Sequence, residues 1–443
     1  MASERHTLLA AALLGLLPIT AQVDYVGARS TGDIGPDITT TSTQKYEERM
    51  AAEGASLYAP RRERLAARDL IRASSFVVDE FLFQGECVVN GPLGDYVNAV
   101  LSEVLKERPE VRAKLRVYVA RDPAVNAFAT DQGIIVVNMG LLARIRNEAE
   151  LAFVLAHEVV HYARRHSLNS AIEGSRRTSR SYRPDATERS MFSVHEYDRS
   201  LESEADLEGW KMVSSGAYDQ GAMFAMFDIL DSADLAMRQV PFEMRFLARM
   251  GLQLPDSLLP DTFATVRIDT TIEEASTHPA VTQRRREIQE LMNGSAHGRT
   301  TVLGEERFQQ VRQLARQEQA LLLTRSESHV AALYQSFLDA RLGSGGLLSD
   351  LAATDALFHL AMEANAPDAD ADILRGRQGV EEQLRLALFN LKPCDVNVIA
   401  LCWAMDQVAR HPESRYLPIA RDRLLQELVA IHGLKLESGA LVV

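Results

Sequence analysis

The segment from Asn147 to His166, NEAELAFVLAHEVVHYARRH, constrains the fold of this chain more than any other. Its first residue is a common helix cap, and the acidic Glu148 and Glu150 suit the positive end of a helix dipole. Apolar side chains such as Leu151 and Val154 recur at helical spacing, which indicates a face packed in a core. The segment therefore predicts a buried helix that carries histidines and carboxylates into the protein.

An HExxH pattern, His157-Glu158-Val159-Val160-His161, lies within this predicted helix. Residues i and i+4 share a helix face, so the two imidazoles can converge on one metal ion. Glu158 projects beside them, where it can accept a proton from a metal-activated water. Two surface histidines on an ordinary helix are the alternative, which the apolar flanks disfavour. The pattern predicts a metal site with Glu158 as a catalytic residue.

A catalytic zinc ion needs a third protein ligand besides two histidines. One extended form of the motif requires Gly at 164 and His at 167, but Arg164 and Ser167 stand there. A carboxylate from the helix predicted over Leu201 to Ser214 is the remaining option. Glu202 and Asp206 share a face of that helix, so one can bind the metal while the other orients a ligand imidazole. Spacing alone does not separate Glu202 from Glu204.

Further motifs surround these residues. They are Asn126-Ala127-Phe128-Ala129, Gly133, Gly140-Leu141-Leu142, Asn147-Glu148-Ala149-Glu150-Leu151, Arg165-His166, Arg199, Ala205-Asp206, Thr277-His278-Pro279 and Arg284. With them the chain resembles, over about residues 85–295, the zinc metallopeptidase family of CAAX prenyl proteases, HtpX-like and periplasmic BepA-like peptidases. One departure is Val160, where the family usually has glycine.

The resemblance implies a zincin-like peptidase core with one zinc ion per chain. It makes Glu202 the third ligand beside His157 and His161. It also implies that the strand after Asn126 borders the cleft, where a polypeptide substrate adds as an extra strand. Asn126, Ala127 and Phe128 are therefore expected to bind substrate.

The resemblance also makes His278 a candidate catalytic residue, because the family has a His-Pro segment near the active site. Three roles stay open for it. It stabilises the oxyanion, it occupies the open metal position and keeps the enzyme latent, or it makes a structural hydrogen bond before Pro279.

Around the motifs the pattern is mainly α with a small β-sheet (α+β). Leu115 to Val119 and Ile134 to Val137 predict strands. Residues 167–200 are rich in Ser and Arg and predict a polar loop, which cannot supply the membrane spans of some relatives. We divide the chain into a signal peptide (1–21), a linker and helical arm (22–78), a metallopeptidase domain (79–298) and an all-helical C-terminal region (299–443). That last region is a candidate partner-binding element, and its repeat-like character is a hypothesis.

Residues 1–21 contain Arg5, an apolar run from Leu8 to Leu17 and a small-residue cleavage site, which predict an export signal. The alternatives are an uncleaved anchor or a disordered tail. The run from Leu8 to Leu17 is shorter than the roughly 20 apolar residues of a membrane span, and no other apolar run reaches that length. We therefore expect a soluble or membrane-peripheral protein, exported and periplasmic.

The formal net charge of −13 opposes a nucleic-acid partner, which requires a concentrated basic face. Three cysteines are too few for a disulfide framework. Cys394 and Cys402 can pair only if they do not share a continuous helix, which would set them about 12 Å apart.

These observations predict a zinc-dependent endopeptidase that hydrolyses misfolded or envelope proteins. Two other classes remain open. One is a latent or vestigial peptidase that acts as a chaperone-like binding protein, for which an intact Glu158 has no use. The other is a metal-dependent hydrolase of non-peptide substrates, for which the edge-strand segment at Asn126 has no use.

Overall fold

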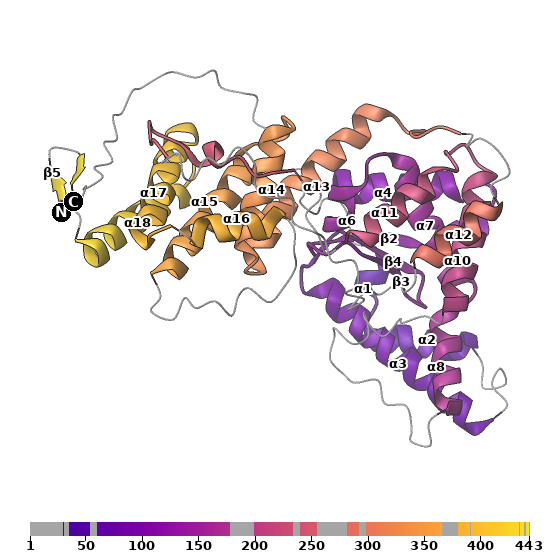
Figure 1. The fold of residues 1–443 in the computed structure, drawn as a ribbon. Helices are drawn as coiled ribbons and strands as arrows, with labels where there is room; N and C mark the ends of the chain where they lie inside the picture. The colour runs from indigo at the N-terminus through magenta and orange to yellow at the C-terminus, as the bar shows by residue number, and fades with distance from the viewer. Residues whose placement is uncertain are drawn as a thin grey trace. The chain divides into compact units, whose positions relative to one another are not determined.

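The computed structural model of the protein describes residues 30, 35–53, 60–177, 199–233, 240–254, 281–291, 298–365, 380–389, 391–433, 435–437 and 440–442. The chain forms two compact units. The sheet unit comprises Tyr25–Asp234 and Glu273–Ala315, and the helical unit comprises Met1–Asp24, Leu235–Ile272 and Arg316–Val443. The predicted class, mainly α with a small sheet, is confirmed (Figure 1).

The helices of the sheet unit are α1 (Pro36–Thr39), α2 (Ser42–Glu53), α3 (Arg61–Phe83), α4 (Gly91–Val104), α5 (Pro109–Arg112), α6 (Met139–Arg144), α7 (Glu148–Ala163), α8 (His166–Arg177), α10 (Arg199–Ser214), α11 (Ala222–Asp231) and α12 (Val281–Leu291). Helix α13 (Glu305–Arg325) contains the point where the chain passes from this unit to the other.

The sheet unit is built on a four-stranded mixed sheet. Its strands are ordered β1 (Cys87–Val88), β2 (Arg116–Ala120), β4 (Ile134–Asn138) and β3 (Ala127–Ala129). Strands β2 and β4 are parallel, whereas β1 and β3 are antiparallel to their neighbours. The predicted strands correspond to β2 and β4, and β3 lies at an edge of the sheet.

Within the described part of the chain, β3 pairs with one strand, β4. The N–H of Asn138 donates to the C=O of Asn126 at 3.0 Å, and the N–H of Thr130 donates to the C=O of Ile134 at 2.8 Å. Because successive residues of a strand turn their backbone groups to opposite sides, those of Ala127 and Ala129 are directed away from β4. Ala127 and Ala129 therefore form the edge of β3 that pairs with no other described strand, here called the free edge, although the Ala129 N–H donates to Glu158.

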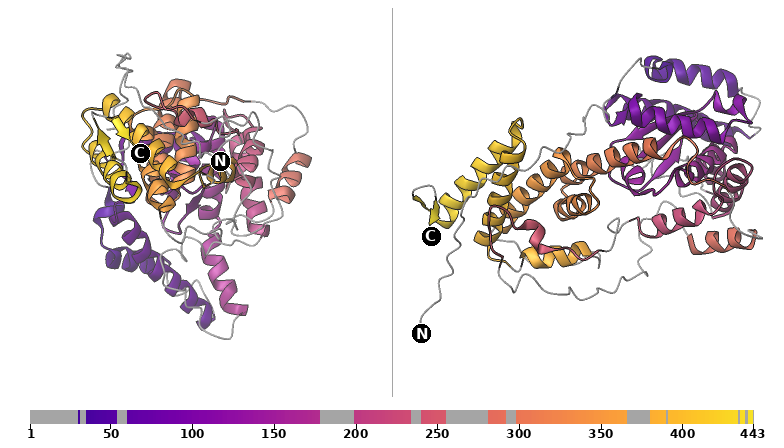
Figure 2. Two further views of the ribbon diagram at one scale, coloured as in Figure 1. Left: turned by 60° about the vertical axis from the view of Figure 1, so that its left-hand side comes forward. Right: turned by 90° about the horizontal axis from the view of Figure 1, so that it is seen from above.

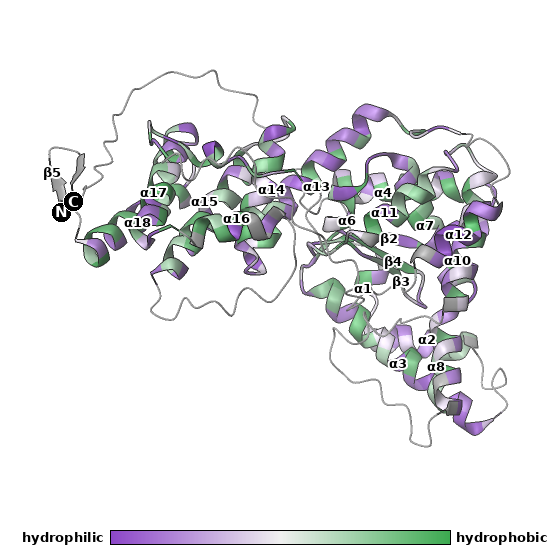
Figure 3. Ribbon diagram, viewed as in Figure 1, coloured by the Kyte–Doolittle hydropathy of each residue, from purple (hydrophilic) through white to green (hydrophobic). Residues whose placement is uncertain are grey.

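Helices cover both faces of the sheet. On one face, Ile134 and Val136 pack with Val78 and Leu82 of α3. The other face contacts α4 and α7. Every residue of β4 is buried, as expected for a strand between two layers, and its hydrophobic colour is visible in Figure 3.

Helix α7 is the predicted central helix. The side chain of Asn147 accepts a hydrogen bond from the Glu150 N–H at 3.0 Å, so the predicted cap is confirmed. Every residue from Glu148 to His161 is buried. The helix therefore holds its histidines away from bulk water.

A buried carboxylate fixes the start of α7. Glu148 is fully buried and accepts hydrogen bonds from the hydroxyls of Tyr96 at 2.6 Å and Tyr218 at 2.7 Å. The backbone N–H groups of Val302 and Leu303 donate to it at 3.0 Å each. One carboxylate thus ties α7 to α4 and to two later segments of the chain.

Helix α10 packs against α7 through a glycine. A Cβ atom on Gly209 would lie only 3.1 Å from the backbone nitrogen of His157 and 3.2 Å from its Cα. The two helices approach this closely because residue 209 has no side chain. This contact brings α10 within reach of the histidines of α7.

Part of the polar segment 167–200 differs from its predicted loop. Residues up to Arg177 form α8, whose apolar Leu168, Ala171 and Ile172 pack on Ala67 and Leu70 of α3. Figures 1 and 2 show α3 and α8 side by side. The loop prediction was wrong here because three apolar residues at helical spacing outweigh the surrounding Ser and Arg. Residues 178–198 lie outside the described part of the chain.

The helical unit contains η2 (Met244–Leu247), α14 (His329–Arg341), α15 (Leu347–Ala364), α16 (Val380–Phe389), α17 (Pro393–Arg410), α18 (Tyr416–His432) and the antiparallel strands β5 (Lys435–Glu437) and β6 (Ala440–Val442). Its core is mainly aliphatic and includes an aromatic group, in which the ring centroids of Phe246 and Trp403 are 4.9 Å apart. Cys394 and Cys402 both lie on α17 as free thiols, which removes the disulfide alternative.

Among the described residues, no helix combines the length and the apolar composition that crossing a bilayer requires. The predicted signal segment, residues 1–21, lies outside the described residues.

Candidate metal centre

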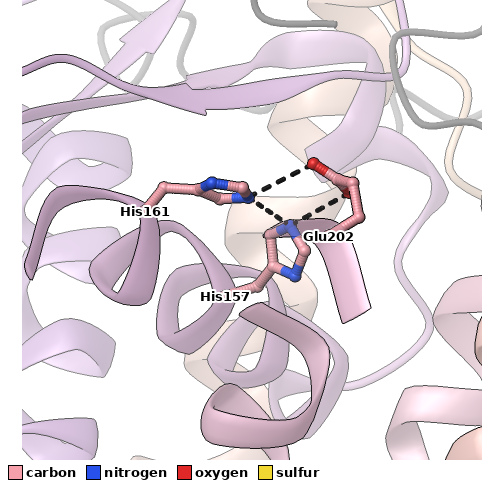
Figure 4. A group of neighbouring side chains, drawn as sticks. All are labelled: His157, His161 and Glu202. Carbon is pink, nitrogen blue, oxygen red and sulfur yellow. Dashed lines mark hydrogen bonds and ion pairs between the residues drawn. The ribbon is translucent and has the colours of Figure 1, made fainter. Parts of the chain in front are cut away.

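Two histidines and a glutamate from two helices converge inside the sheet unit (Figure 4). His157 and His161 come from α7, and Glu202 comes from α10. The Nε2 atoms of the histidines are 2.9 Å apart. Glu202 places Oε2 3.6 Å from His157 Nε2 and Oε1 3.4 Å from His161 Nε2. All three side chains are buried, and Glu202 has no exposed surface.

This donor set fits a tetrahedral zinc ion. Zinc bonds of about 2.0–2.1 Å to nitrogen and oxygen set neighbouring ligand atoms about 3.3 Å apart. The two distances from Glu202, 3.4 and 3.6 Å, lie close to that spacing, and the separation of the two Nε2 atoms, 2.9 Å, is shorter. Two imidazoles and a carboxylate are also the ligand types of known catalytic zinc sites. The site can therefore hold zinc with a fourth position open.

A second layer of side chains orients both imidazoles. His157 Nδ1 lies 2.9 Å from Asp206 Oδ1. His161 Nδ1 lies 2.8 Å from His166 Nδ1. Such contacts fix the tautomer and the ring plane of a ligand histidine. Both rings thereby turn Nε2 toward Glu202.

Burial also suits His161 to bind a cation. Its pKa falls to about 3, chiefly because burial disfavours the charged imidazolium and also because His157 lies nearby, although Glu202 opposes the shift. At neutral pH the imidazole is therefore uncharged, with a lone pair available to a metal.

Arg284 of α12 contacts the carboxylates of both Asp206 and Glu202. It is 4% exposed, with Nη2 2.7 Å from Asp206 Oδ1 and Nη1 2.9 Å from Glu202 Oε2. Burial opposes the ionisation of Asp206, but hydrogen bonds from Arg284 and His157 outweigh it and lower the pKa of that carboxyl. Both carboxylates thus have a permanent cationic partner.

Arg284 is among the residues that carry the family resemblance, but the sequence alone indicates no role for it. Three consecutive arginines stand at 284–286, and local sequence does not distinguish them. In the structure Arg285 pairs with Asp228 and Arg286 is exposed. The packing of α12 therefore determines which of the three arginines contacts the site carboxylates.

Glu158 follows the first histidine and is 3% exposed. Burial raises the pKa of its carboxyl well above the ordinary value, and Glu202 raises it further. A hydrogen bond from the Ala129 N–H and the charge of Arg284 oppose this shift. The free edge of β3 therefore touches the residue predicted to act as the base.

The structure distinguishes Glu202 from Glu204. The side chain of Glu204 is 39% exposed, 3.2 Å from Arg164 Nε and 3.4 Å from His166 Nε2. It therefore lies behind His166 instead of beside the two Nε2 atoms. His166 joins this chain of contacts to the candidate ligand His161.

The predicted substrate-binding residues separate into two sets. Asn126 and Ala127 line a pocket next to His157 and Glu158. Phe128 points to the opposite face of the sheet, where its ring centroid is 6.4 Å from that of Phe81. His278 lies outside the described residues.

The pocket is open and has an empty volume, including its mouth, of about 370 Å³. Beside Asn126, Ala127, His157 and Glu158, it is lined by Leu141, Phe153, Val154, Met226, Leu230 and Arg284. A ligand can therefore approach the predicted base and the first histidine from this side.

Comparison with known proteins bears on the same region. Residues 94–292 match the sequence profile described as Peptidase family M48. The match begins within α4 and extends beyond the end of α12, and it includes all the site residues discussed above that the structure describes, together with His278.

Several relatives are similar over parts of their length. Identity is 26% to the putative beta-barrel assembly-enhancing protease of Vibrio cholerae, covering 35% of this chain and 39% of the relative. The beta-barrel assembly-enhancing protease of Yersinia pestis is 30% identical over 36% of this chain and 29% of the relative. The mitochondrial metalloendopeptidase OMA1 of Schizosaccharomyces pombe is 28% identical over 31% of this chain and 44% of the relative. The chain thus spans less than half the length of each of these relatives.

Proposed function

This chain carries a Peptidase family M48 domain over residues 94–292, and we propose that it is a zinc-dependent endopeptidase. The observation that carries the proposal is the buried convergence of His157, His161 and Glu202, with Glu158 beside them at an open pocket. A binding protein without hydrolytic activity has no need for a buried carboxylate at that position.

His157, His161 and Glu202 hold the zinc ion in this proposal. Bound there, zinc would lower the pKa of a water molecule to about 7 and would polarise the carbonyl of the substrate. Asp206 and His166 keep the two imidazoles oriented, and Arg284 balances the charge of the carboxylates. The protein thus supplies a rigid, neutralised site before substrate arrives.

Glu158 acts as the general base and then as the general acid. It takes a proton from the attacking water and returns it to the amine of the leaving peptide. Burial raises the pKa of its carboxyl, which makes it a stronger base than an exposed glutamate. The Ala129 N–H donates to this carboxyl, so β3 positions the base as well as the substrate edge.

A polypeptide substrate adds to the free edge of β3. The N–H and C=O of Ala127 are directed away from β4, and the residue lines the pocket beside Glu158. An extended peptide pairing with Ala127 passes directly beside the proposed zinc ligands. Asn126 lines the same pocket, whereas the side chain of Phe128 anchors β3 on α3.

The finer parts of the proposal rest on sequence. The segment at 1–21 supports export, and we place the protein in the periplasm with misfolded or envelope proteins as substrates. Names of two relatives, beta-barrel assembly-enhancing proteases, suit this setting. His278 has either a regulatory or an oxyanion-stabilising role, and the helices of the C-terminal region bind a partner.

Substitution of Glu158 by Gln tests the chemistry. General acid–base catalysis contributes about 10²- to 10⁴-fold, so we expect cleavage of an unfolded, fluorescently labelled protein to fall by at least about 100-fold. Zinc content should not change, because Glu158 is not a ligand. A matched Glu208→Gln variant alters a carboxylate on the outer side of α10, paired with Arg164, and should cleave normally.

Retained cleavage in Glu158→Gln would exclude this mechanism. Binding of the unfolded protein by zinc-loaded wild type without any cleavage would instead favour the chaperone-like alternative.

A further inference from the structure

Helix α2 lies outside the region that matches the family profile, yet it contacts the turn between β3 and β4. The match begins at residue 94, whereas α2 spans Ser42–Glu53. This helix packs along α3, beside which it lies in Figure 1. The guanidinium of Arg49 forms an ion pair with the carboxylate of Asp131, which belongs to the turn. A helix upstream of the peptidase domain therefore contacts the hairpin that carries the free edge.

The contacts of Arg49 join α2, α3 and the turn. Its Nη1 atom donates to the hydroxyls of Ser74 at 3.0 Å and Ser75 at 2.8 Å and to the C=O of Ile71 at 3.1 Å, all on α3. Its Nη2 atom pairs with Asp131. The side chain of Arg49 is 18% exposed and that of Asp131 is 12% exposed. Solvent and salt therefore screen this ion pair less than one at the open surface.

The turn itself has further contacts with α3. The side chain of Gln132 donates to the C=O of Ser74 at 2.8 Å, and the hydroxyl of Ser74 donates to Asp131 at 3.3 Å. Gly133 has a positive φ of 84°, and its N–H donates to the C=O of Thr130 at 3.2 Å. Helices α2 and α3 thus hold the turn together, with Arg49 as a bridge between them.

The turn leads directly into the proposed active site. Asp131 follows Ala129 by two positions, and the Ala129 N–H donates to Glu158. Ala127, at the other end of β3, lines the pocket beside Glu158 and is the residue to which we assign substrate pairing. Strand β3 has three residues and pairs with one described strand, β4. Its position therefore depends on the turn that follows it.

We infer that Arg49 is a positioning residue for the peptidase site: through Asp131 it holds the β3–β4 turn, and thereby the free edge, in the conformation that pairs with substrate. The inference rests on the proposed peptidase function and gives a helix outside the family match a role in it. Without the ion pair the edge samples other conformations, and a substrate must first order it. Apparent affinity then falls with the fraction of molecules in the competent conformation.

Substitution of Arg49 by Met removes the guanidinium and keeps an unbranched side chain on α2. A hydrogen bond to a charged group corresponds to about a tenfold or greater change in an equilibrium constant. We therefore expect the KM for an unstructured peptide to rise about tenfold. The kcat should stay within about threefold of wild type, because bound substrate orders the edge. The matched control, Glu48→Met, makes the same replacement at the exposed neighbouring position and should keep the wild-type KM.

General destabilisation would give a different result. Partial unfolding lowers the fraction of active molecules, which reduces the apparent kcat and leaves KM unchanged. Zinc content per chain should be equal in Arg49→Met and wild type, because the proposed ligands lie on α7 and α10 and not on the hairpin.

Hydrogen exchange measured by mass spectrometry supplies a readout without turnover. In Arg49→Met, the segment from Ala127 to Gly133 should exchange about tenfold faster than in wild type, whereas the segment from Glu148 to His161 of α7 should be unchanged. Asp131→Asn should reproduce both the exchange and the KM effect. A variant with both substitutions should be no worse than either single variant, because both remove the same interaction.

The outcomes separate this inference from the proposed function. If zinc-loaded wild type cleaves but both single variants keep the wild-type KM and exchange, the positioning role is overturned and the peptidase remains. Effects of the two substitutions that multiply, or a lower kcat with faster exchange in α7, would also overturn it. No cleavage by zinc-loaded wild type would remove the peptidase function and the inference with it.

Discussion

Replacing Asp206 by Asn removes one negative charge from behind the proposed zinc site and keeps the size of the side chain. Asp206 accepts from His157 Nδ1 at 2.9 Å and is paired with Arg284, whose Nη2 lies 2.7 Å from Oδ1. Arg284 contacts two carboxylates, those of Asp206 and Glu202. After the substitution, the carboxylate of Glu202 is the one that remains of these two. Two effects then weaken zinc binding together: His157 becomes a poorer donor, and Arg284 competes with zinc for Glu202.

The size of the effect follows from these contacts. Loss of a hydrogen-bonding partner behind a metal ligand typically reduces metal affinity by about 10- to 100-fold. That range corresponds to about 1.4–2.7 kcal/mol of binding free energy. Because Arg284 also gains access to Glu202, we expect a value near the upper end.

A competition titration with a chromogenic zinc chelator measures the affinity directly. The control is Glu208→Gln, which removes a charge from the same helix, where Glu208 pairs with Arg164 at the surface. It should bind zinc within about threefold of wild type, since surface pairs contribute at most about 1 kcal/mol. Circular dichroism of the zinc-free proteins establishes that both variants fold. A folded Asp206→Asn protein with wild-type zinc affinity would refute the role assigned to Asp206.

Two further predictions concern packing and burial. Gly209→Val should lower the melting temperature and weaken zinc binding, because the valine side chain would collide with the His157 backbone and push α10 and Glu202 away. Overpacking of this kind lowers the free energy of unfolding by about 1–3 kcal/mol. Unchanged values in both a thermal melt and a zinc titration would contradict this. Asp339 is fully buried in α14, and burial raises its pKa from 3.8 to about 6, although Ser349 and Gln335 oppose the shift. Between these values the folded state binds more protons than the unfolded state, so the free energy of unfolding should fall by about 2 kcal/mol as pH rises from 4 to 6. Denaturant titrations across this range should show a flatter dependence for Asp339→Asn, and an identical slope would contradict the assignment.

The parts of the site that depend on local spacing could be predicted from sequence. His157 and His161 share a face because they are one helical turn apart, and Asn147 caps α7 through a contact within the first turn. Strand β4 was predictable because a β-branched run bounded by Gly133 and Gly140 has few other conformations. These relations need no knowledge of the rest of the chain.

Other features depend on where helices end. On a continuous helix from Asn147 to His166, the side chain of His166 would lie off the face that carries His157 and His161. Helix α7 instead ends at Ala163, and Arg165 adopts a left-handed conformation with φ of 57°. That turn redirects the chain and brings His166 back onto His161 at 2.8 Å. A helical projection cannot anticipate such a reversal.

Long-range packing accounts for the remaining differences. Arg284 reaches Asp206 across 78 positions of sequence, and its burial depends on how α12 packs against α10. Phe128 faces α3 because the pairing of β3 with β4 fixes which side chains point to which side. Neither relation leaves a local signal, although the alternation within β3 would have suggested Phe128 once its neighbours were known.

In the proposed metal centre, His157, His161 and Glu202 together hold one zinc ion. The zinc content per chain of purified wild type and of Glu202→Ala, measured by mass spectrometry after reconstitution and gel filtration, tests this site most directly. We predict about one zinc per chain in wild type and a sharp loss in the variant, since a catalytic zinc site uses three protein ligands. Equal zinc in both proteins, or none in either, would contradict the three-ligand site.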